Sequence, residues 1–352
     1  MTIHLCGPHA YLTSNLDATD KGWIQKAPCV KAIDDAAPLR LADSRAITIY
    51  RESNEDLGTM LTKLAGSRPT FVEGKNEYKA KMPDLLDHIA WMQIFVPACH
   101  AHGLKVAGFS IAVGNLDPDG VTALDEAGWA GVDATAYHAY WAMQGPVSDW
   151  TTYRYRRWYA QTGGHMPPVI ITEAGRDTVE QEGGAGKPGW MTQGISPEQY
   201  YAEWQEFDRQ LQYDAKLSVT WQGRRWPLVL GATGFCLRGT TQWANYEMAP
   251  LAAWFARDSV IGGTTMTWDR HVEYDAYQKV FGGQGANPND AFGRLRTANI
   301  GVDYGVLVGS YRGVTDATSP FITAWTTTGI FWYRKATGEA GFATREESLP
   351  LA

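Results

Sequence analysis

Short apolar runs alternate with amphipathic segments through about the first 257 residues of the chain. Eight of these runs are rich in apolar and β-branched residues and end at polar or turn-forming residues, which predicts buried strands. They cover residues 3–8, 29–33, 46–51, 70–77, 105–113, 133–140, 168–173 and 229–237. Apolar residues at helical spacing predict helices over 54–64, 82–102 and 197–213, and a last helix over 248–257.

This regular alternation of strands and helices favours an α/β fold, a (β/α)8 TIM barrel at residues 1–258. An open doubly wound sheet would need a glycine-rich first turn to bind phosphate, and Cys6-Gly7-Pro8 does not provide one. From residue 259 on, Gly, Thr, Asn and Asp separate short runs at 305–311, 321–326 and 329–334. That pattern predicts a small β-rich C-terminal module over 259–352. The segment 331–344 resembles the closing hairpin of bacterial SH3-like domains, a Trp-Tyr strand followed by a glycine turn and a Gly-aromatic strand.

Two glutamates stand at the ends of predicted strands, Glu77 after the fourth and Glu173 after the seventh. In a (β/α)8 barrel, functional residues gather at the carboxyl ends of the strands. Two carboxyl groups on one rim suit glycosidic bond cleavage, which needs one protonated group for the leaving oxygen and one ionised group for the oxocarbenium-like carbon. Burial and mutual repulsion push the pKa values of such a pair apart and so create the two roles. Glu73, predicted on the same side of its strand as Glu77, is expected to be a buried ion-pair partner of Arg51.

The other strand ends supply further polar and aromatic candidates. Asp34 and Asp35 fit equally well as rim residues or as helix caps. The remaining candidates are His9, Arg51, Asn76, Asn115, His138, Tyr140, Arg238 and, a little further on, Trp243.

Three short motifs on these strands resemble those of clan GH-A, the large clan of retaining (β/α)8 glycoside hydrolases: Asn76-Glu77, His138-Ala-Tyr140 and Thr172-Glu173-Ala-Gly. The resemblance covers roughly residues 1–257. It implies that Glu77 is the general acid/base and Glu173 the nucleophile of a double displacement.

The same resemblance implies roles for the neighbouring residues. Asn76 would hold the sugar 2-hydroxyl, Tyr140 would bond to the nucleophile carboxylate, and His138 and Arg51 would complete the polar floor. Many members of the clan carry a Trp at the end of the eighth strand as a sugar platform. Here Phe235-Cys-Leu-Arg238 stands at that place, which leaves Trp243 or Trp141 as the candidate platform.

Composition narrows the function further. With 31 Lys and Arg against 38 Asp and Glu, the net charge of −7 argues against nucleic acid as a partner. The 15 Trp and 17 Tyr residues provide rings that pack in the core or stack on sugars. No apolar run is long enough for a membrane span, and the N-terminus lacks the basic leader and apolar stretch of a secretory signal.

The four cysteines, Cys6, Cys29, Cys99 and Cys236, have no metal-binding spacing and are expected to be free buried thiols. In the predicted barrel, Cys6 and Cys236 lie on neighbouring strands. A metal site could be assembled from His9, Asp34, His138 and Glu173, but the His-x-His motif of many barrel metallohydrolases is missing from the first strand. No metal and no cofactor is therefore predicted.

The leading hypothesis is a retaining glycoside hydrolase that acts on a β-linked oligo- or polysaccharide. One alternative is a phage or bacterial cell-wall lytic glycosidase, in which the C-terminal module binds the wall. The other is a non-catalytic carbohydrate-binding barrel, and the presence of both glutamates counts against it.

Overall fold

The computed structural model of the 352-residue chain describes two separate parts. The first is residues 2–261, with gaps at 12, 54–55, 65–66, 68, 78–80, 143–144 and 179–187. The second is residues 321–325, 329–334 and 340–344. The chain divides into two compact units, Met1–Thr265 and Met266–Ala352.

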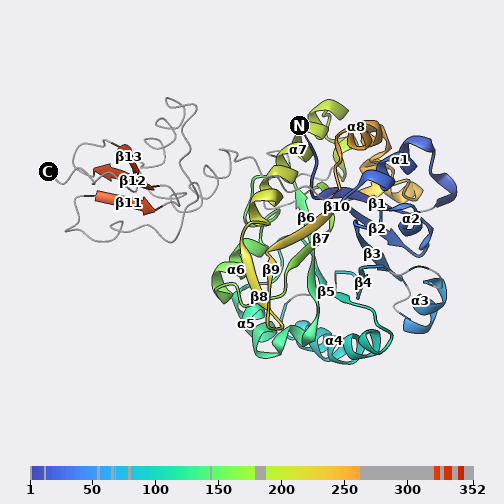
Figure 1. Cartoon of the computed structure of the whole chain (residues 1–352), viewed down its shortest axis with the longest axis horizontal. Helices are drawn as coiled ribbons and strands as arrows, with labels where there is room; N and C mark the ends of the chain where they lie inside the picture. The colour runs from blue at the N-terminus through green and yellow to red at the C-terminus, as the bar shows by residue number, and fades with distance from the viewer. Residues whose placement is uncertain are drawn as a thin grey trace. The chain divides into compact units, whose positions relative to one another are not determined.

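Eight parallel strands form a closed barrel in the order β1-β10-β7-β6-β5-β4-β3-β2, so the predicted (β/α)8 fold is confirmed (Figure 1). The strands are β1 (Cys6–Ala10), β2 (Cys29–Ile33), β3 (Ile47–Arg51), β4 (Phe71–Glu73), β5 (Val106–Ile111), β6 (Ala134–Trp141), β7 (Val169–Arg176) and β10 (Val229–Leu237). Two of the predicted strands have the observed bounds, whereas the fourth ends at Glu73 instead of residue 77 and the seventh continues to Arg176.

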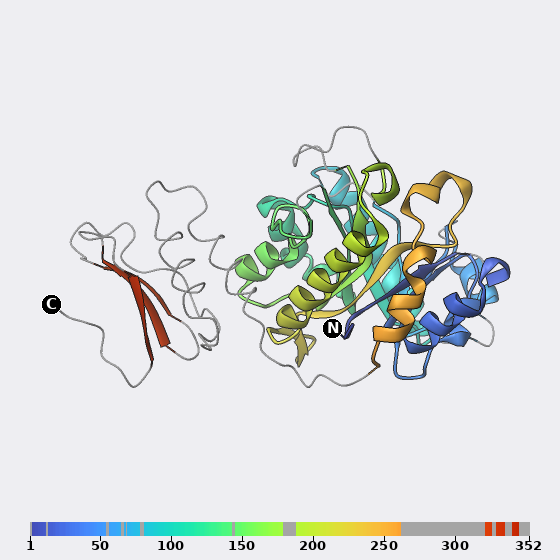
Figure 2. The ribbon, with the colours of Figure 1, turned by 90° about the horizontal axis from the view of Figure 1, so that it is seen from above.

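The helices lie outside the strands (Figures 1 and 2). They are α1 (Ala18–Lys26), α2 (Ala37–Leu41), α3 (Leu57–Lys63), α4 (Asp84–Ala101), α5 (Pro118–Glu126), α6 (Tyr155–Thr162), α7 (Pro197–Asp214) and α8 (Ala252–Asp258). Ser196 caps α7 as its sequence predicts: the Ser196 side chain accepts from Gln199 N–H, and the Gln199 side chain accepts from Ser196 N–H. Within the described residues, no helix is both long and apolar enough to cross a membrane.

One hairpin of the barrel unit was not predicted. Strands β8 (Ser218–Trp221) and β9 (Arg224–Pro227) pair antiparallel just before β10. Trp221 in this hairpin donates from Nε1 to the carbonyl of Val132, which precedes β6. The hairpin therefore lies at the amino-terminal end of the barrel strands, away from the rim where the candidate residues were predicted.

The four cysteines are free and buried. The parallel register pairs Cys6 with Ala232 and Ala10 with Leu237. Cys6 begins β1, whereas Cys236 lies on the neighbouring strand β10, near the level of the last residue of β1.

In the second part of the chain, β11 (Phe321–Trp325), β12 (Gly329–Arg334) and β13 (Ala340–Thr344) form a three-stranded antiparallel sheet. The predicted runs at 321–326 and 329–334 correspond to β11 and β12. The predicted run at 305–311 lies outside the described residues. A complete β-rich module over 259–352, and its SH3-like character, stay predictions.

Candidate active site

The inside of the barrel is built in two layers, an apolar one below and a charged one above. The apolar layer is a cluster of Cys29, Ile49, Phe71, Ala107, Ala134, Ala136 and Ile170. Side chains two residues further along a strand point to the same face. Lys31, Arg51, Glu73 and His138 each stand two residues after a member of the lower layer, and all four are buried.

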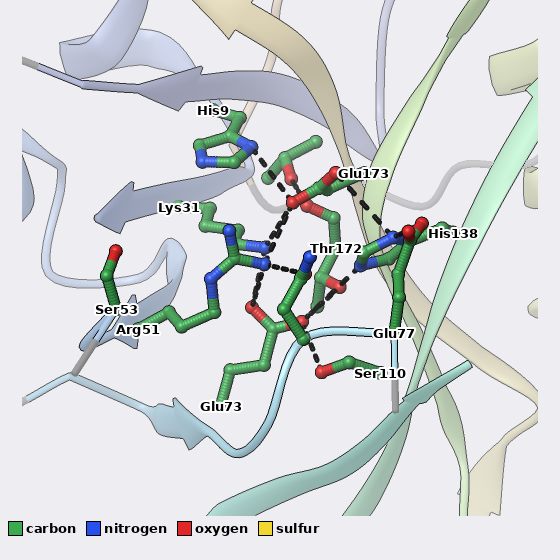
Figure 3. Close-up of polar contacts among 12 residues, drawn as sticks. His9, Lys31, Arg51, Ser53, Glu73, Glu77, Ser110, His138, Thr172 and Glu173 are labelled. Carbon is green, nitrogen blue, oxygen red and sulfur yellow. Dashed lines mark hydrogen bonds and ion pairs between the residues drawn. The ribbon is translucent and has the colours of Figure 1, made fainter. Parts of the chain in front are cut away.

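Glu173 lies at the centre of the charged layer (Figure 3). Its Oε1 accepts hydrogen bonds from Lys31 Nζ at 3.1 Å and from Arg51 Nη1 at 3.0 Å. Its Oε2 accepts from the Tyr140 hydroxyl at 3.0 Å. His138 Nδ1 lies 3.6 Å from the same Oε2. Groups from three other strands, β2, β3 and β6, thus contact this carboxylate and fix its position.

A β-bulge in β7 brings Glu173 inward. The register pairs Tyr137 with Ile171 and His138 with Glu173, which leaves Thr172 as the extra residue. Ile170 belongs to the inner apolar layer, whereas Ile171 packs in the outer core. Simple alternation would therefore place Thr172 inside and Glu173 outside. Because of the bulge both reach the interior, where Thr172 donates to Glu73 Oε1 at 2.6 Å.

Glu73 is an ion-pair partner, as expected, but chiefly of Lys31 rather than Arg51. Lys31 Nζ lies 2.5 Å from Glu73 Oε2, and Arg51 Nη1 lies 4.0 Å from it. Ser110 donates to Glu73 Oε1 at 2.8 Å. Arg51 was expected as the partner because residues 29–33 were interpreted only as an apolar run, although Lys31 stands in the middle of that run.

Glu77 reaches the site from a turn rather than from the strand. Three residues separate it from the end of β4, and its backbone has a left-handed φ of 45°. Residues other than glycine rarely adopt that conformation, and those that do are often found at functional sites. The Glu77 side chain is 41% exposed, and its Oε1 lies 2.7 Å from His138 Nδ1. Asn76, beside it, bonds to Arg51.

The charges around Glu173 decide its ionisation. Burial alone would raise the pKa of Glu173, but the positive charges of His138, Lys31 and Arg51 hold it well below its usual range. Burial alone would lower the pKa of His138, and the negative charge of Glu173 together with its contacts to Glu73 and Glu77 raises it to about 9. His138 is therefore an imidazolium at neutral pH, and Glu173 a carboxylate.

His9 behaves differently from His138. Its Nδ1 lies 3.8 Å from Glu173 Oε1, and neither ring nitrogen has a hydrogen-bond partner. Burial, with Lys31 nearby, lowers the pKa of His9 well below its usual value. The ring is thus neutral and packs as an aromatic, stacked on Tyr11 and edge-on to Phe235.

A cavity of about 150 Å³ opens above the charged layer. Four aromatic residues, Tyr11, Phe235, Trp243 and Tyr246, form much of its wall, and the polar lining is Arg51, Asn76, Glu77, Tyr140, Glu173 and Asp177. Trp243 packs edge-on against Phe235, with ring centroids 5.1 Å apart. Of the residues for which the resemblance or the platform argument implied a role, all except His138 and Trp141 line the cavity, and His138 lies directly behind Glu77 and Glu173.

Trp141 does not reach the cavity, so it is not brought to the site as expected. The alternation that points His138 and Tyr140 inward points Trp141 outward. Trp141 is fully buried between the barrel and α7, where its Nε1 donates to Glu203 and its ring packs on Trp204 and Phe207.

Other rim candidates have structural partners. Asp34 accepts from the Ser53 hydroxyl at 2.6 Å, and Asp35 accepts from Ala37 N–H at the start of α2. Arg238 bonds to Asp17 and Asp20. The contacts of Asp34 leave it out of the charged layer, so the ligand set considered for a metal is not assembled. Among the described residues, no group of three or more His, Cys, Asp or Glu side chains has metal-binding geometry.

Sequence reasoning missed five residues of the site: Lys31, Tyr11, Asp177, Phe235 and Tyr246. Tyr11 and Asp177 each follow a barrel strand by one residue, so the rule that found the other rim residues could have found them. Tyr246 donates to Asp177 Oδ1 at 2.6 Å from the segment after β10. No sequence pattern identifies that contact.

The fold and the site define a (β/α)8 barrel with a charged interior layer beneath an aromatic-walled cavity. A scan against models of known protein families finds no match, and a search of curated proteins finds none either. Two solved structures are similar. A monomeric beta-xylosidase from Caulobacter crescentus CB15 has 12% identity over 73% of this chain and 70% of that chain, with a TM-score of 0.42. A GH128 (subgroup II) endo-beta-1,3-glucanase from Sorangium cellulosum has 16% identity over 74% and 100%, with a TM-score of 0.43.

Proposed function

We propose that this chain is a glycoside hydrolase that cleaves a β-linked glycan with retention of configuration. The observation that carries the proposal is that two carboxyl groups with opposite surroundings meet at one imidazole. Glu173 is buried among cations, and Glu77 stands at the exposed edge of the cavity. A glycosidase needs one carboxylate that stays ionised and one carboxyl group that exchanges a proton.

The separation of the two groups favours the retaining mechanism. Glu77 Oε1 lies 2.7 Å and Glu173 Oε2 3.6 Å from the same atom, His138 Nδ1. Those two oxygens are consequently no further apart than the sum of the two distances, 6.3 Å. Retaining enzymes hold their carboxyl groups about 5–5.5 Å apart and inverting enzymes about 6.5–9.5 Å. For these two oxygens, the upper bound lies below the inverting range.

The proposed reaction has two displacements. In the first, a Glu173 oxygen forms a bond to the anomeric carbon while the glycosidic C–O bond breaks, and Glu77 gives its proton to the departing oxygen. In the second, Glu77 takes a proton from water as the water oxygen bonds to the anomeric carbon, and the ester bond to Glu173 breaks. Glu77 ends protonated and Glu173 ionised, as they began.

Binding groups surround this pair. Asn76 and Arg51 line the floor of the cavity beside Glu173, where they would hold sugar hydroxyls. Trp243 and Phe235 offer ring faces and edges that suit the apolar side of a sugar. The cell-wall alternative depends on residues 266–352, where the structure describes one small sheet, and it stays a prediction.

The decisive test is hydrolysis of a panel of β-linked glycans, peptidoglycan included, with the product anomers followed by NMR. Glu173→Ala and Glu77→Ala should each abolish turnover of an unactivated glycan. Azide should rescue Glu173→Ala and give a glycosyl azide of inverted configuration. Glu198→Ala, which removes a solvent-exposed glutamate of α7, is the matched control and should keep full activity.

Two results would overturn the proposal. A Glu77→Ala/Glu173→Ala double variant that still hydrolyses the glycan would remove both residues from the chemistry. A first-formed product of inverted anomeric configuration would contradict the retaining mechanism while leaving a glycosidase.

A further inference from the structure

Lys31 is a fully buried cation in the middle of β2. Its neighbours along the strand, Val30 and Ala32, are apolar and belong to the outer core. Taking an ammonium group out of water costs several kcal/mol unless close partners compensate. Lys31 has two such partners, Glu73 Oε2 at 2.5 Å and Glu173 Oε1 at 3.1 Å. One carboxylate would already balance its charge, so the contact with the second needs its own explanation.

The ammonium group touches Glu173 from the side away from the substrate. Arg51 and Tyr140, which also bond to Glu173, line the cavity, whereas Lys31 does not. In Figure 3, Lys31 and Arg51 lie between Glu73 and Glu173. Lys31 therefore acts on the carboxylate and not on the sugar. Glu73 in turn holds Lys31 in place, and Ser110 and Thr172 hold Glu73.

We propose that Lys31 is a positioning residue for the reaction: its ammonium group, anchored by Glu73, holds the Glu173 carboxylate in the ionised form and in the orientation that attacks the anomeric carbon. This inference rests on the proposed glycosidase function. It assigns a role to a residue outside the cavity, and it makes Glu73 the anchor of that residue.

Several titratable groups face Glu173 and bear on any pH dependence. They come from every element packed around it: His9 and Tyr11 at β1, Lys31 on β2, Arg51 on β3, Glu73 on β4, Glu77 after β4, His138 and Tyr140 on β6, Asp177 after β7 and Cys236 on β10. Of the cations, Lys31 and Arg51 share Oε1 at nearly equal distances. Loss of Lys31 should thus weaken, without abolishing, the stabilisation of the carboxylate.

The competing explanation is that Lys31 only neutralises Glu73. A double variant, Lys31→Met with Glu73→Gln, separates the two explanations because it removes both charges together. Replacing both members of a buried ion pair is often neutral for folding, whereas removing one strands the other. Circular dichroism and the unfolding midpoint would establish that the double variant is folded.

The measurement is the pH profile of kcat/KM, together with kcat and KM, on the best glycan of the panel. In the double variant we expect the acid limb to move up by about one pH unit or more, which corresponds to at least a tenfold loss below that limb. KM should stay within about twofold, because Lys31 does not touch the cavity. Glu73→Gln alone keeps the lysine on Glu173, so its acid limb should lie at or below that of the wild type.

Two outcomes overturn the inference. One is a folded double variant with the wild-type acid limb and kcat, because Lys31 would then serve Glu73 alone. The other is a Glu73→Gln variant whose acid limb rises as far as that of the double variant. Lys63→Met with Glu52→Gln is the matched control: it removes both members of an ion pair, 2.9 Å apart, outside the site, and it should leave the profile unchanged. A wild type inactive on every glycan, or an active Glu173→Ala, would instead refute the proposed function.

Discussion

The charge on His138 should make the stability of the barrel fall as the pH rises from neutral to alkaline. The ring is fully buried, and its pKa is raised from 6.5 to about 9 by Glu173, Glu73 and Glu77. At 1.36 kcal/mol per pKa unit, this difference is worth on the order of 3 kcal/mol of folding free energy. Because the folded-state pKa is the higher one, the contribution is complete below pH 6.5 and is lost as the pH rises through about 9.

His138 should contribute a slope of about 1.4 kcal/mol per pH unit between those two values, since at this ring the folded state binds up to one more proton than the unfolded chain. Urea unfolding followed by circular dichroism at half-unit steps from pH 6 to 9.5 would measure it, with His138→Gln as the comparison. Burial also raises the pKa values of the four cysteine thiols. Unfolded thiols ionise only near pH 8.5, but burial lowers the pKa values of His9 and His88 in the folded state, so unfolded His9 and His88 bind protons near pH 6.5 and oppose the slope there. The contribution of His138 is therefore the difference in slope between the wild type and His138→Gln.

An equal pH dependence of the free energy of unfolding from pH 6.5 to 8 in the wild type and in His138→Gln would refute the reasoning. An NMR titration of the histidine rings provides an independent reading. The resonance that disappears in the variant should titrate near pH 9 in the wild type. If it titrates near its ordinary value instead, the surrounding carboxylates do not hold the proton.

Three further predictions concern single side chains. Asp208→Ala removes a buried carboxylate that accepts backbone N–H bonds from residues 4–6, and it should lower the free energy of unfolding by about 3 kcal/mol or more, measured in urea. The exposed control Asp43→Ala should change it by less than about 0.5 kcal/mol. Trp243→Ala should lower kcat/KM on a glycan about tenfold, a loss of roughly 1.4 kcal/mol, with little effect on stability. Trp141→Phe should instead lower the free energy of unfolding by about 1–3 kcal/mol, because the hydrogen bond to Glu203 is lost, and should change KM by less than about twofold.

The barrel was predictable because each strand is a short apolar run separated from the next by a helical segment. Period-two alternation on β6 also puts His138 and Tyr140 on one face and Trp141 on the other, as the structure has them. The seventh strand shows where this rule fails. Glu173 stands two residues after Ile171, yet Ile171 faces outward and a bulge at Thr172 turns Glu173 inward.

The ion pairs of the site could not be predicted in the same way, because they depend on which strands become neighbours across the barrel. Lys31 lies on β2 and Glu173 on β7, with only β1 and β10 between them on the shorter path around the barrel. Their contact crosses the interior of the barrel, and no sequence pattern indicates how close the two side chains come. A lysine inside an apolar strand is nevertheless a usable signal, since a buried ammonium group must have a partner.

The charge balance of the layer ties the two proposed roles together. Its buried members are three cations, Lys31, Arg51 and the His138 imidazolium, and two carboxylates, Glu73 and Glu173. A protonated Glu77 leaves this group with one positive charge, and an ionised Glu77 makes it neutral. In the proposed glycosyl-enzyme, Glu173 is an ester and Glu77 has given up its proton, so the same groups again carry one positive charge. The net charge around the two carboxyl groups is therefore the same at the start of both proposed displacements.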